Sequence, residues 1–421
     1  MPQPDQIYIL VLQTLLRTIS ALLKETPMNV RRLIISSVVV GVLSISAFLL
    51  YFWPRFIVES DAGAIHNLRG ISQSASKKTP RMVEEPGVAS KAAGDSVTGS
   101  SDEEGGYYAY QTYAAQVREL LYQERFELLD STAAGLRLGR SRFRGGAWKL
   151  HKFYIGLEEP ADGKKATEAE WQHQLSEIRK WTERYPDSIT ACVGLGAALV
   201  NYAWKARGTG FADTVSDGGW RLFRERLAQA ERVLNEARRL KTRCPHWYAI
   251  MQNVATGQGW DAGRYDQLFE EGIAAEPLYH YLYSNKAQYL LPRWRGAPGD
   301  WERFAEEVRV RGGGKNGSIL YYIIASDLSG YYKGRAFFAE SDVSWAKMKQ
   351  GFADRDDVYG ANNQDLNEMS RLAGWAGDPE ASRKFFERIG DDWDSHTWGE
   401  KKYFDEFKAW AFKASPTAGR R

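Results

Sequence analysis

Residues that commonly carry chemistry are sparse in this chain of 421 residues. Its six histidines show no HExxH or comparable metal-ligand spacing, and its two cysteines are too few for a structural zinc site. No GxSxG motif occurs, and the GGGKNGS stretch at 312–318 lacks the spacing of a phosphate-binding loop. The sequence therefore predicts no metal and no cofactor, 312–318 is expected to be a loop, and we assign no catalytic residue.

Acidic side chains offer a weak hypothesis of acid–base chemistry. Asp266, Glu270, Glu271 and Glu276 lie close together in the sequence and could be proposed as a general acid and base for glycan cleavage. Carboxylates on a helix face are usually solvent-facing charge, and no pair among these has a local environment that marks it out. A helical fold alone does not imply an activity.

A cluster of binding-type residues surrounds the ends of two regular helical pairs. Its members are His246, Trp247, Tyr248, Gln258, Trp260, Asp261, Arg293, Trp294, Asp300 and Trp301. Because equivalent turns of successive repeats stack along one edge of a repeat protein, these side chains are predicted to form an interaction surface for a peptide or a glycan. The competing interpretation is structural, with tryptophans between helices and aspartates as helix caps.

The two cysteines are candidates for a disulfide. Cys192 lies near the start of one predicted helix, and Cys244 is placed at the end of the helix that returns antiparallel to it. Both thiols are therefore expected at the same end of one hairpin, where an oxidising compartment would allow a bond. Two buried free thiols are the alternative.

Helical periodicity dominates the chain after residue 107. Between 220 and 237, Trp220, Phe223, Leu227, Ala230, Leu234 and Ala237 recur at steps of three and four, which predicts one buried stripe on a long helix. Pro186, Pro245 and Pro277 separate successive helices, and breaks that contain Gly, Trp and Asp lie within pairs. The distance from Pro245 to Pro277 is close to the tetratricopeptide period. The fold class is therefore predicted to be all-α, an irregular TPR-like α-solenoid of about five helical pairs over 107–414.

An uncharged apolar run at 33–53 predicts a single transmembrane helix, because its length of about 31 Å matches a hydrocarbon core. Arg31 and Arg32 precede it, so residues 1–32 are predicted to be cytoplasmic or interfacial and the large domain to lie outside the cytoplasm. The shorter apolar stretch at 7–23 is more typical of an interfacial helix. Residues 60–106 are rich in Ser, Gly, Ala and Pro, which predicts a disordered linker.

The overall charge argues against one class of partner. The formal net charge is only +3, and basic and acidic residues alternate along the helices instead of forming a block. Nucleic acid is therefore not an expected partner. The many aromatic residues are expected mainly to fill helix interfaces.

Several segments together resemble a known family. They are KARGTGFADTVSDGGWRLFRERLAQA, HWYAIMQNVATGQGWDAGRYDQLFEEGIAAEP and YLLPRWRGAPGDWERFAEE, which contain the motifs GQGWD and PRWxGxPGDWE. They are similar to an uncharacterised bacterial tetratricopeptide-like family, catalogued as a domain of unknown function, over residues 171–312. The resemblance implies an α-helical repeat fold and no established activity, and it covers neither the N-terminal anchor nor the chain after Gly313.

Two functional hypotheses follow from these observations. The leading one is a non-enzymatic protein-interaction scaffold in the bacterial envelope, held at the inner membrane by residues 33–53, with a periplasmic domain that binds a partner protein. The alternative is a cell-wall glycan binder or glycan hydrolase. Recovery of a stable protein partner would support the first hypothesis, and binding or cleavage of purified cell-wall polymer would support the second.

Overall fold

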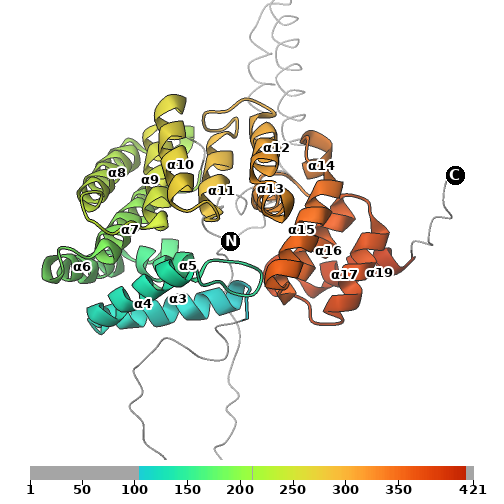
Figure 1. Ribbon diagram of the computed structural model, residues 1–421, viewed down its shortest axis with the longest axis horizontal. Helices are drawn as coiled ribbons and strands as arrows, with labels where there is room; N and C mark the ends of the chain where they lie inside the picture. Colours follow the sequence, from blue (N-terminus) through green and yellow to red (C-terminus); the bar gives the residue numbers. More distant parts are fainter. Residues whose placement is uncertain (1–103, 211, 414–421) are drawn as a thin grey trace, which may run out of the picture. The chain divides into compact units, whose positions relative to one another are not determined.

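The computed structural model describes residues 104–210 and 212–413, and every regular element in that part of the chain is a helix (Figure 1). The α-helices are α3 (Tyr107–Tyr122), α4 (Phe126–Gly139), α5 (Lys149–Glu158), α6 (Glu168–Arg184), α7 (Ile189–Arg207), α8 (Asp217–Ala237), α9 (Pro245–Gln258), α10 (Ala262–Ala275), α11 (Tyr281–Tyr289), α12 (Asp300–Gly312), α13 (Gly314–Ser329), α14 (Ala336–Glu340), α15 (Trp345–Tyr359), α16 (Asn363–Trp375), α17 (Pro379–Ile389), α18 (Ser395–Trp398) and α19 (Lys401–Lys413). Two 3-10 helices, η1 (Gly163–Lys165) and η2 (Ala212–Thr214), lie in connections. The predicted all-α class is confirmed for these residues.

The predicted membrane anchor at 33–53 lies outside the described residues, as do the segment 1–32 and most of the linker predicted at 60–106. Among the helices of the described ranges, none is both long and apolar enough to cross a membrane.

Consecutive helices pack against each other, and alternate helices pack in series. The helices α5, α7, α9, α11 and α13 each contact the next member of that series, while α6, α8, α10 and α12 pack on them. The buried stripe predicted for 220–237 is the core face of α8, where Phe223, Leu227 and Leu234 are buried and Trp220 is half-buried. Burial of such stripes is the main stabilising contribution in a helical array.

Two of the predicted helix breaks have the expected caps. The α9–α10 connection has Gly259 in the left-handed conformation at φ +69°, and Asp261 caps α10 by accepting a hydrogen bond from the Arg264 amide at 3.0 Å. Asp378 caps α17 in the same way, with Pro379 at the first helical position. A glycine that ends one helix and an aspartate that starts the next satisfy backbone groups that would otherwise be unpaired.

The prediction of a loop at 312–318 is wrong. Helix α12 runs through Gly312 and α13 starts at Gly314, so only Gly313 separates the two helices. A Cβ atom on Gly317 would lie 2.1 Å from the Arg309 carbonyl oxygen. These glycines therefore allow two helices to approach closely, although the same composition is typical of loops.

The first helices of the described domain contact its last helices (Figure 1). The Gly145 amide donates to the Gly360 carbonyl at 2.7 Å, and the Arg144 guanidinium donates to the Ala361 carbonyl at 2.7 Å. At the start of α3, the Tyr107 ring stacks on His396 with centroids 4.1 Å apart. The series of helices therefore closes on itself at a junction between the α4–α5 connection and the α15–α16 connection.

Two glycines make this junction sterically feasible. Gly145 and Gly146 have φ values of +86° and +81°, which L side chains rarely adopt. A Cβ atom on Gly145 would lie 2.3 Å from an Asp365 carboxylate oxygen, and one on Gly146 would lie 2.7 Å from the Tyr359 ring. Any larger residue would have to displace α15 and α16.

Candidate functional site

The ten residues predicted to form an interaction surface do not gather on one exposed face. His246, Trp247 and Trp301 are buried. His246 lies near the start of α9 and Gln258 at its end, which places them about 18 Å apart along the helix axis. Proximity in sequence and equivalence in the repeat were therefore insufficient to bring these side chains together.

The buried members connect helices to one another. The Trp247 indole donates to the Leu234 carbonyl of α8 at 2.7 Å, and the Trp301 indole donates to the Tyr332 hydroxyl at 3.1 Å. His246 hydrogen bonds to the Tyr279 hydroxyl at 2.9 Å and approaches the Glu158 carboxylate of α5 at 3.3 Å. These contacts favour the structural interpretation for the three residues.

Several of the other members are partly exposed. Trp260 donates to Gln258 at 2.8 Å, and the Arg264 guanidinium lies 3.1 Å from its ring centroid. The Trp294 ring is half-buried and packs edge-on against Trp204 at 5.7 Å. Each tryptophan therefore covers the core and keeps one edge near solvent.

The remaining members have local roles. Tyr248 is half-buried and packs edge-on against Trp247 at 4.9 Å. Asp300 occupies the first turn of α12 and accepts a hydrogen bond from the Ala297 amide at 2.6 Å, so it stabilises the preceding turn without being the cap residue, which is Gly299. Arg293 contacts a residue outside this set of ten, because its guanidinium lies 4.7 Å from the Tyr331 ring centroid.

The two cysteines are free thiols in the structure, so the predicted disulfide is not formed. Helix α8 ends at Ala237, seven residues earlier than assumed, and Cys244 is the residue that precedes α9. Its thiol faces the Tyr154 hydroxyl at 3.4 Å. Burial, followed by nearby carboxylates, raises the pKa of Cys192 to about 11, which keeps that thiol protonated and unreactive at neutral pH.

A cluster of charged and phenolic side chains at the junction is the strongest candidate site. We call it the junction cluster, and it consists of Tyr110, Tyr281, Tyr322, Asp327, Arg355, Asp365, Glu368 and Arg371. Its members come from α3, α11, α13, α15 and α16, which are distant in sequence. The charge of each carboxylate affects the pKa of at least one other member, so the groups form one electrostatic unit.

Arg355 and Asp365 form the most buried ion pair of the cluster. Their side chains are 15% and 10% exposed, and the guanidinium lies 3.1 Å from the carboxylate. Asp365 also closes a capping box at the start of α16, because it accepts a hydrogen bond from the Asn362 amide at 3.2 Å. Burial lowers the pKa of Arg355, but Asp365 and the neighbouring acidic groups raise it by more, so this residue stays charged.

Glu368 has the most unusual electrostatic environment. Its ion-pair partner is Arg371, whose guanidinium lies 3.9 Å from the carboxylate. Burial, opposed by Arg371 and reinforced by Asp365, raises the pKa of Glu368 to about 7. A carboxyl group with this pKa can hold or release a proton near neutral pH. Glu368 is nevertheless 30% exposed, so water reaches it although protein surrounds it.

Partly exposed aromatic and basic side chains extend from this cluster. Arg371 lies 4.9 Å from the Trp375 ring centroid, and Tyr281 and Tyr331 are half-buried. Burial first, and the Asp327 carboxylate in addition, raise the pKa of both tyrosines. We call the connected set the binding face, which consists of Tyr281, Arg293, Asp327, Tyr331, Glu368, Arg371 and Trp375.

Sequence reasoning missed the segment that organises this site, residues 140–151. The Trp148 indole donates to the Leu278 carbonyl at 3.0 Å, and His151 stacks on Tyr281 with centroids 3.5 Å apart. The Arg140 guanidinium forms an ion pair with Glu276 at 2.8 Å. The adjacent glycines between aromatic and basic residues in RFRGGAW were a signal for a tight connection that approaches another backbone.

Comparison with known proteins adds no assignment. No family model matches the sequence, and no curated protein or solved structure matches it either. The resemblance to the tetratricopeptide-like family is therefore neither supported nor contradicted. Within the part of the chain that the structure describes, no group of three or more His, Cys, Asp or Glu side chains is arranged to hold a metal ion.

Proposed function

We propose that this chain is a membrane-anchored helical-repeat protein, a TPR-like α-solenoid, that binds a partner protein through the binding face. The observation that carries the proposal is the concentration of partly exposed Tyr, Trp and Arg side chains on α11, on α16 and in the turns that follow α11 and α13. These residue types are enriched among the side chains that dominate protein–protein affinity. A surface that is already ordered loses little conformational entropy when it binds.

A photo-crosslinking experiment tests the proposed binding face. A photoreactive amino acid would replace Tyr331 in the full chain in native membranes, and the same substitution at Val310, which is 65% exposed on α12, would be the control. We expect a discrete protein adduct from position 331 that is absent from position 310. The adduct should disappear when Arg371→Ala is added, with unchanged melting. Identical adducts at both positions, or none at 331, would contradict the proposal.

The membrane and envelope location is part of the same proposal. It rests on the uncharged run at 33–53 with Arg31 and Arg32 before it. Protease added to intact spheroplasts should digest the domain that follows the anchor, with lysed cells as the control. Full protection in intact spheroplasts would refute the periplasmic placement.

A second candidate function is glycan hydrolysis, and the Glu368 carboxyl group favours it. An acid that is protonated near pH 7, with the Asp327 carboxylate within electrostatic range, is the kind of pair that glycosidases use. Purified cell-wall polymer would be incubated with the full chain and with Glu368→Gln. Release of soluble fragments that the variant cannot produce would support hydrolysis. Absence of release by the unaltered chain removes this candidate and leaves the binding function.

A further inference from the structure

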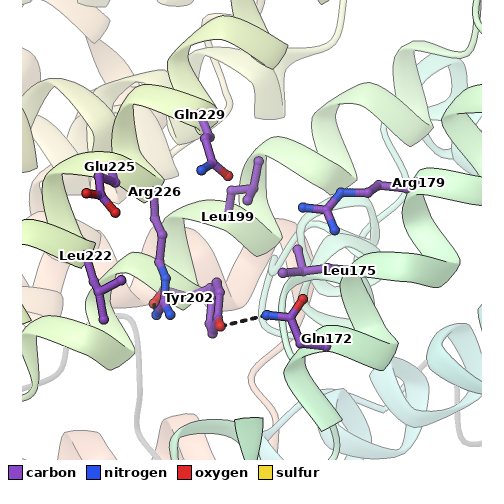
Figure 2. A pocket seen from close by; sticks show the side chains of 9 residues that line it. All are labelled: Gln172, Leu175, Arg179, Leu199, Tyr202, Leu222, Glu225, Arg226 and Gln229. Atoms are coloured by element: carbon purple, nitrogen blue, oxygen red, sulfur yellow. Dashed lines mark hydrogen bonds between the residues drawn. The ribbon is translucent and has the colours of Figure 1, made fainter. Parts of the chain in front are cut away.

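A second site lies between α6, α7 and α8, and it shares no residue with the junction cluster. It is a cleft of about 220 Å³ (Figure 2). Helix α6 contributes Gln172, Leu175 and Arg179, helix α7 contributes Leu199 and Tyr202, and helix α8 contributes Leu222, Glu225, Arg226 and Gln229. Both α6 and α8 pack on α7, so the middle of α7 forms the floor.

The floor of the cleft is apolar and rigid. Leu175, Leu199 and Leu222 line it together with the Tyr202 ring. That ring stacks on Trp171 with centroids 5.1 Å apart, and the Arg226 guanidinium lies 3.2 Å from its centroid on another side. Arg226 also donates to the Tyr202 carbonyl at 2.8 Å. Tyr202 is thus held from two directions, and an apolar ligand group would meet a preformed surface.

Hydrogen-bond donors surround this apolar floor. Figure 2 shows Arg179 and Gln229 directed toward the space above Leu199 from opposite helices. Among the described residues, neither side chain has an ion pair or a hydrogen bond to its polar end. The Gln172 amide lies at a third side and donates to the Tyr202 hydroxyl at 2.8 Å.

The acidic groups near the cleft already have partners. Glu225 pairs with Arg221 at 3.4 Å, where both side chains are exposed. Glu168 accepts a hydrogen bond from Gln172 at 3.0 Å and lies 3.9 Å from Arg226. Arg179 therefore remains available to an incoming anion, and a planar guanidinium suits a carboxylate better than a point charge does.

We infer that this cleft binds a small carboxylate with an apolar body. Arg179 pairs with the carboxylate, Gln229 donates to it, and the apolar body rests on Leu175, Leu199 and the Tyr202 ring. The size fits this ligand class, because a cavity of about 150 Å³ holds benzene. The carboxylate can belong to a free small acid or to the C-terminal residue of a peptide chain.

Calorimetry on the full chain in detergent tests this inference with 3-phenylpropionate and its uncharged analogue 3-phenylpropanamide. We expect the acid to bind at least tenfold more tightly than the amide, because a hydrogen bond between charged groups is the stronger kind. Arg179→Gln should remove this preference. Arg184→Gln, an exposed arginine on the same helix that does not line the cleft, should retain it.

Two peptides distinguish the sources of the carboxylate. One ends in phenylalanine with a free carboxylate, and the other has the same sequence with an amidated terminus. Tighter binding of the free-carboxylate peptide than of 3-phenylpropionate assigns the cleft to chain termini, and the reverse order assigns it to free acids. Equal binding of acid and amide, an equal loss in both arginine variants, or no binding of any carboxylate probe would overturn the inference.

Discussion

Glu368 shows how a single side chain can couple this fold to pH. Its pKa of about 7 in the folded chain lies above the value of about 4.3 for an unperturbed glutamate. The folded state therefore binds the proton more tightly than the unfolded state does. Stability from this group is highest at low pH and is lost progressively as pH rises from about 4 to about 7.

Replacement of this glutamate by glutamine gives the corresponding prediction. Glu368→Gln is neutral at every pH, so it should be more stable than the unaltered chain at about pH 8, by about 1–3 kcal/mol after allowance for its water access. The difference in the free energy of unfolding between the two proteins should shrink toward about pH 4. Urea unfolding at both pH values measures this difference. Glu387→Gln, at an exposed site on α17, is the control variant, and a Glu368→Gln variant that is less stable at high pH would refute the assignment.

The tryptophans of the repeat turns differ in how deeply they are buried. Trp301 is 1% exposed, whereas Trp260 is half-buried. Trp301→Ala should cost about 3–5 kcal/mol because it leaves a cavity, and Trp260→Ala should cost less, about 1–2 kcal/mol, because its ring has less surface to lose from the core. Thermal unfolding of the two variants decides the matter. Equal losses would show that exposure does not separate their roles.

At the scale of elements, the close contact between α12 and α13 depends on glycines inside helices. Alanine normally favours a helix over glycine by about 1 kcal/mol. A Cβ atom on Gly317 would collide with the Arg309 carbonyl, whereas one on Gly135 of α4 would meet no atom within 4 Å. Replacement of glycine by alanine is thus expected to lower the stability at position 317 and to raise it at position 135.

Gly317→Ala should destabilise the domain by about 1–3 kcal/mol, because the collision forces the two helices apart. Gly135→Ala, its matched control, should stabilise by about 0.5–1 kcal/mol. Chemical denaturation with both variants measures these changes. If Gly317→Ala stabilised the domain as Gly135→Ala does, the two helices would not approach as closely as the structure indicates.

For the domain as a whole, the junction between the first and the last helices is the main tertiary feature. It fixes the binding face, because Tyr281 stacks on His151 while Glu368 follows the α15–α16 connection. A substitution at Gly145 tests the junction, because an added Cβ atom would collide with Asp365. Gly377 is the matched control, since it also has a positive φ, of +71°, but no atom within 4 Å of a Cβ.

Gly145→Ala should cost at least about 2 kcal/mol and should open the junction, which would increase hydrogen exchange in α3 and α16. Gly377→Ala should cost only the conformational penalty of about 1 kcal/mol, with unchanged exchange in α3. Mass spectrometry of hydrogen exchange separates these outcomes. Equal protection of α3 in both variants would show that Gly145 does not hold the junction.

Local signals in the sequence determined the helical class and many helix boundaries. Phe223, Leu227 and Leu234 share a face at helical spacing, and Gly259 and Asp261 end and start helices through their own backbone and side-chain chemistry. Such interactions operate within a few residues, so periodicity and capping reveal them. The loop predicted at 312–318 failed because the close approach of α12 and α13 places glycine inside helices.

Only the tertiary structure decided which residues form the candidate sites. Tyr110, Tyr281 and Glu368 are each separated by more than eighty residues, and they meet because the helices close on themselves at Gly145. The raised pKa of Glu368 likewise depends on burial and on charges from other helices. The sequence pattern indicates which side of a helix is apolar. The packing angles and distances of many helix pairs together decide which polar sides come into contact.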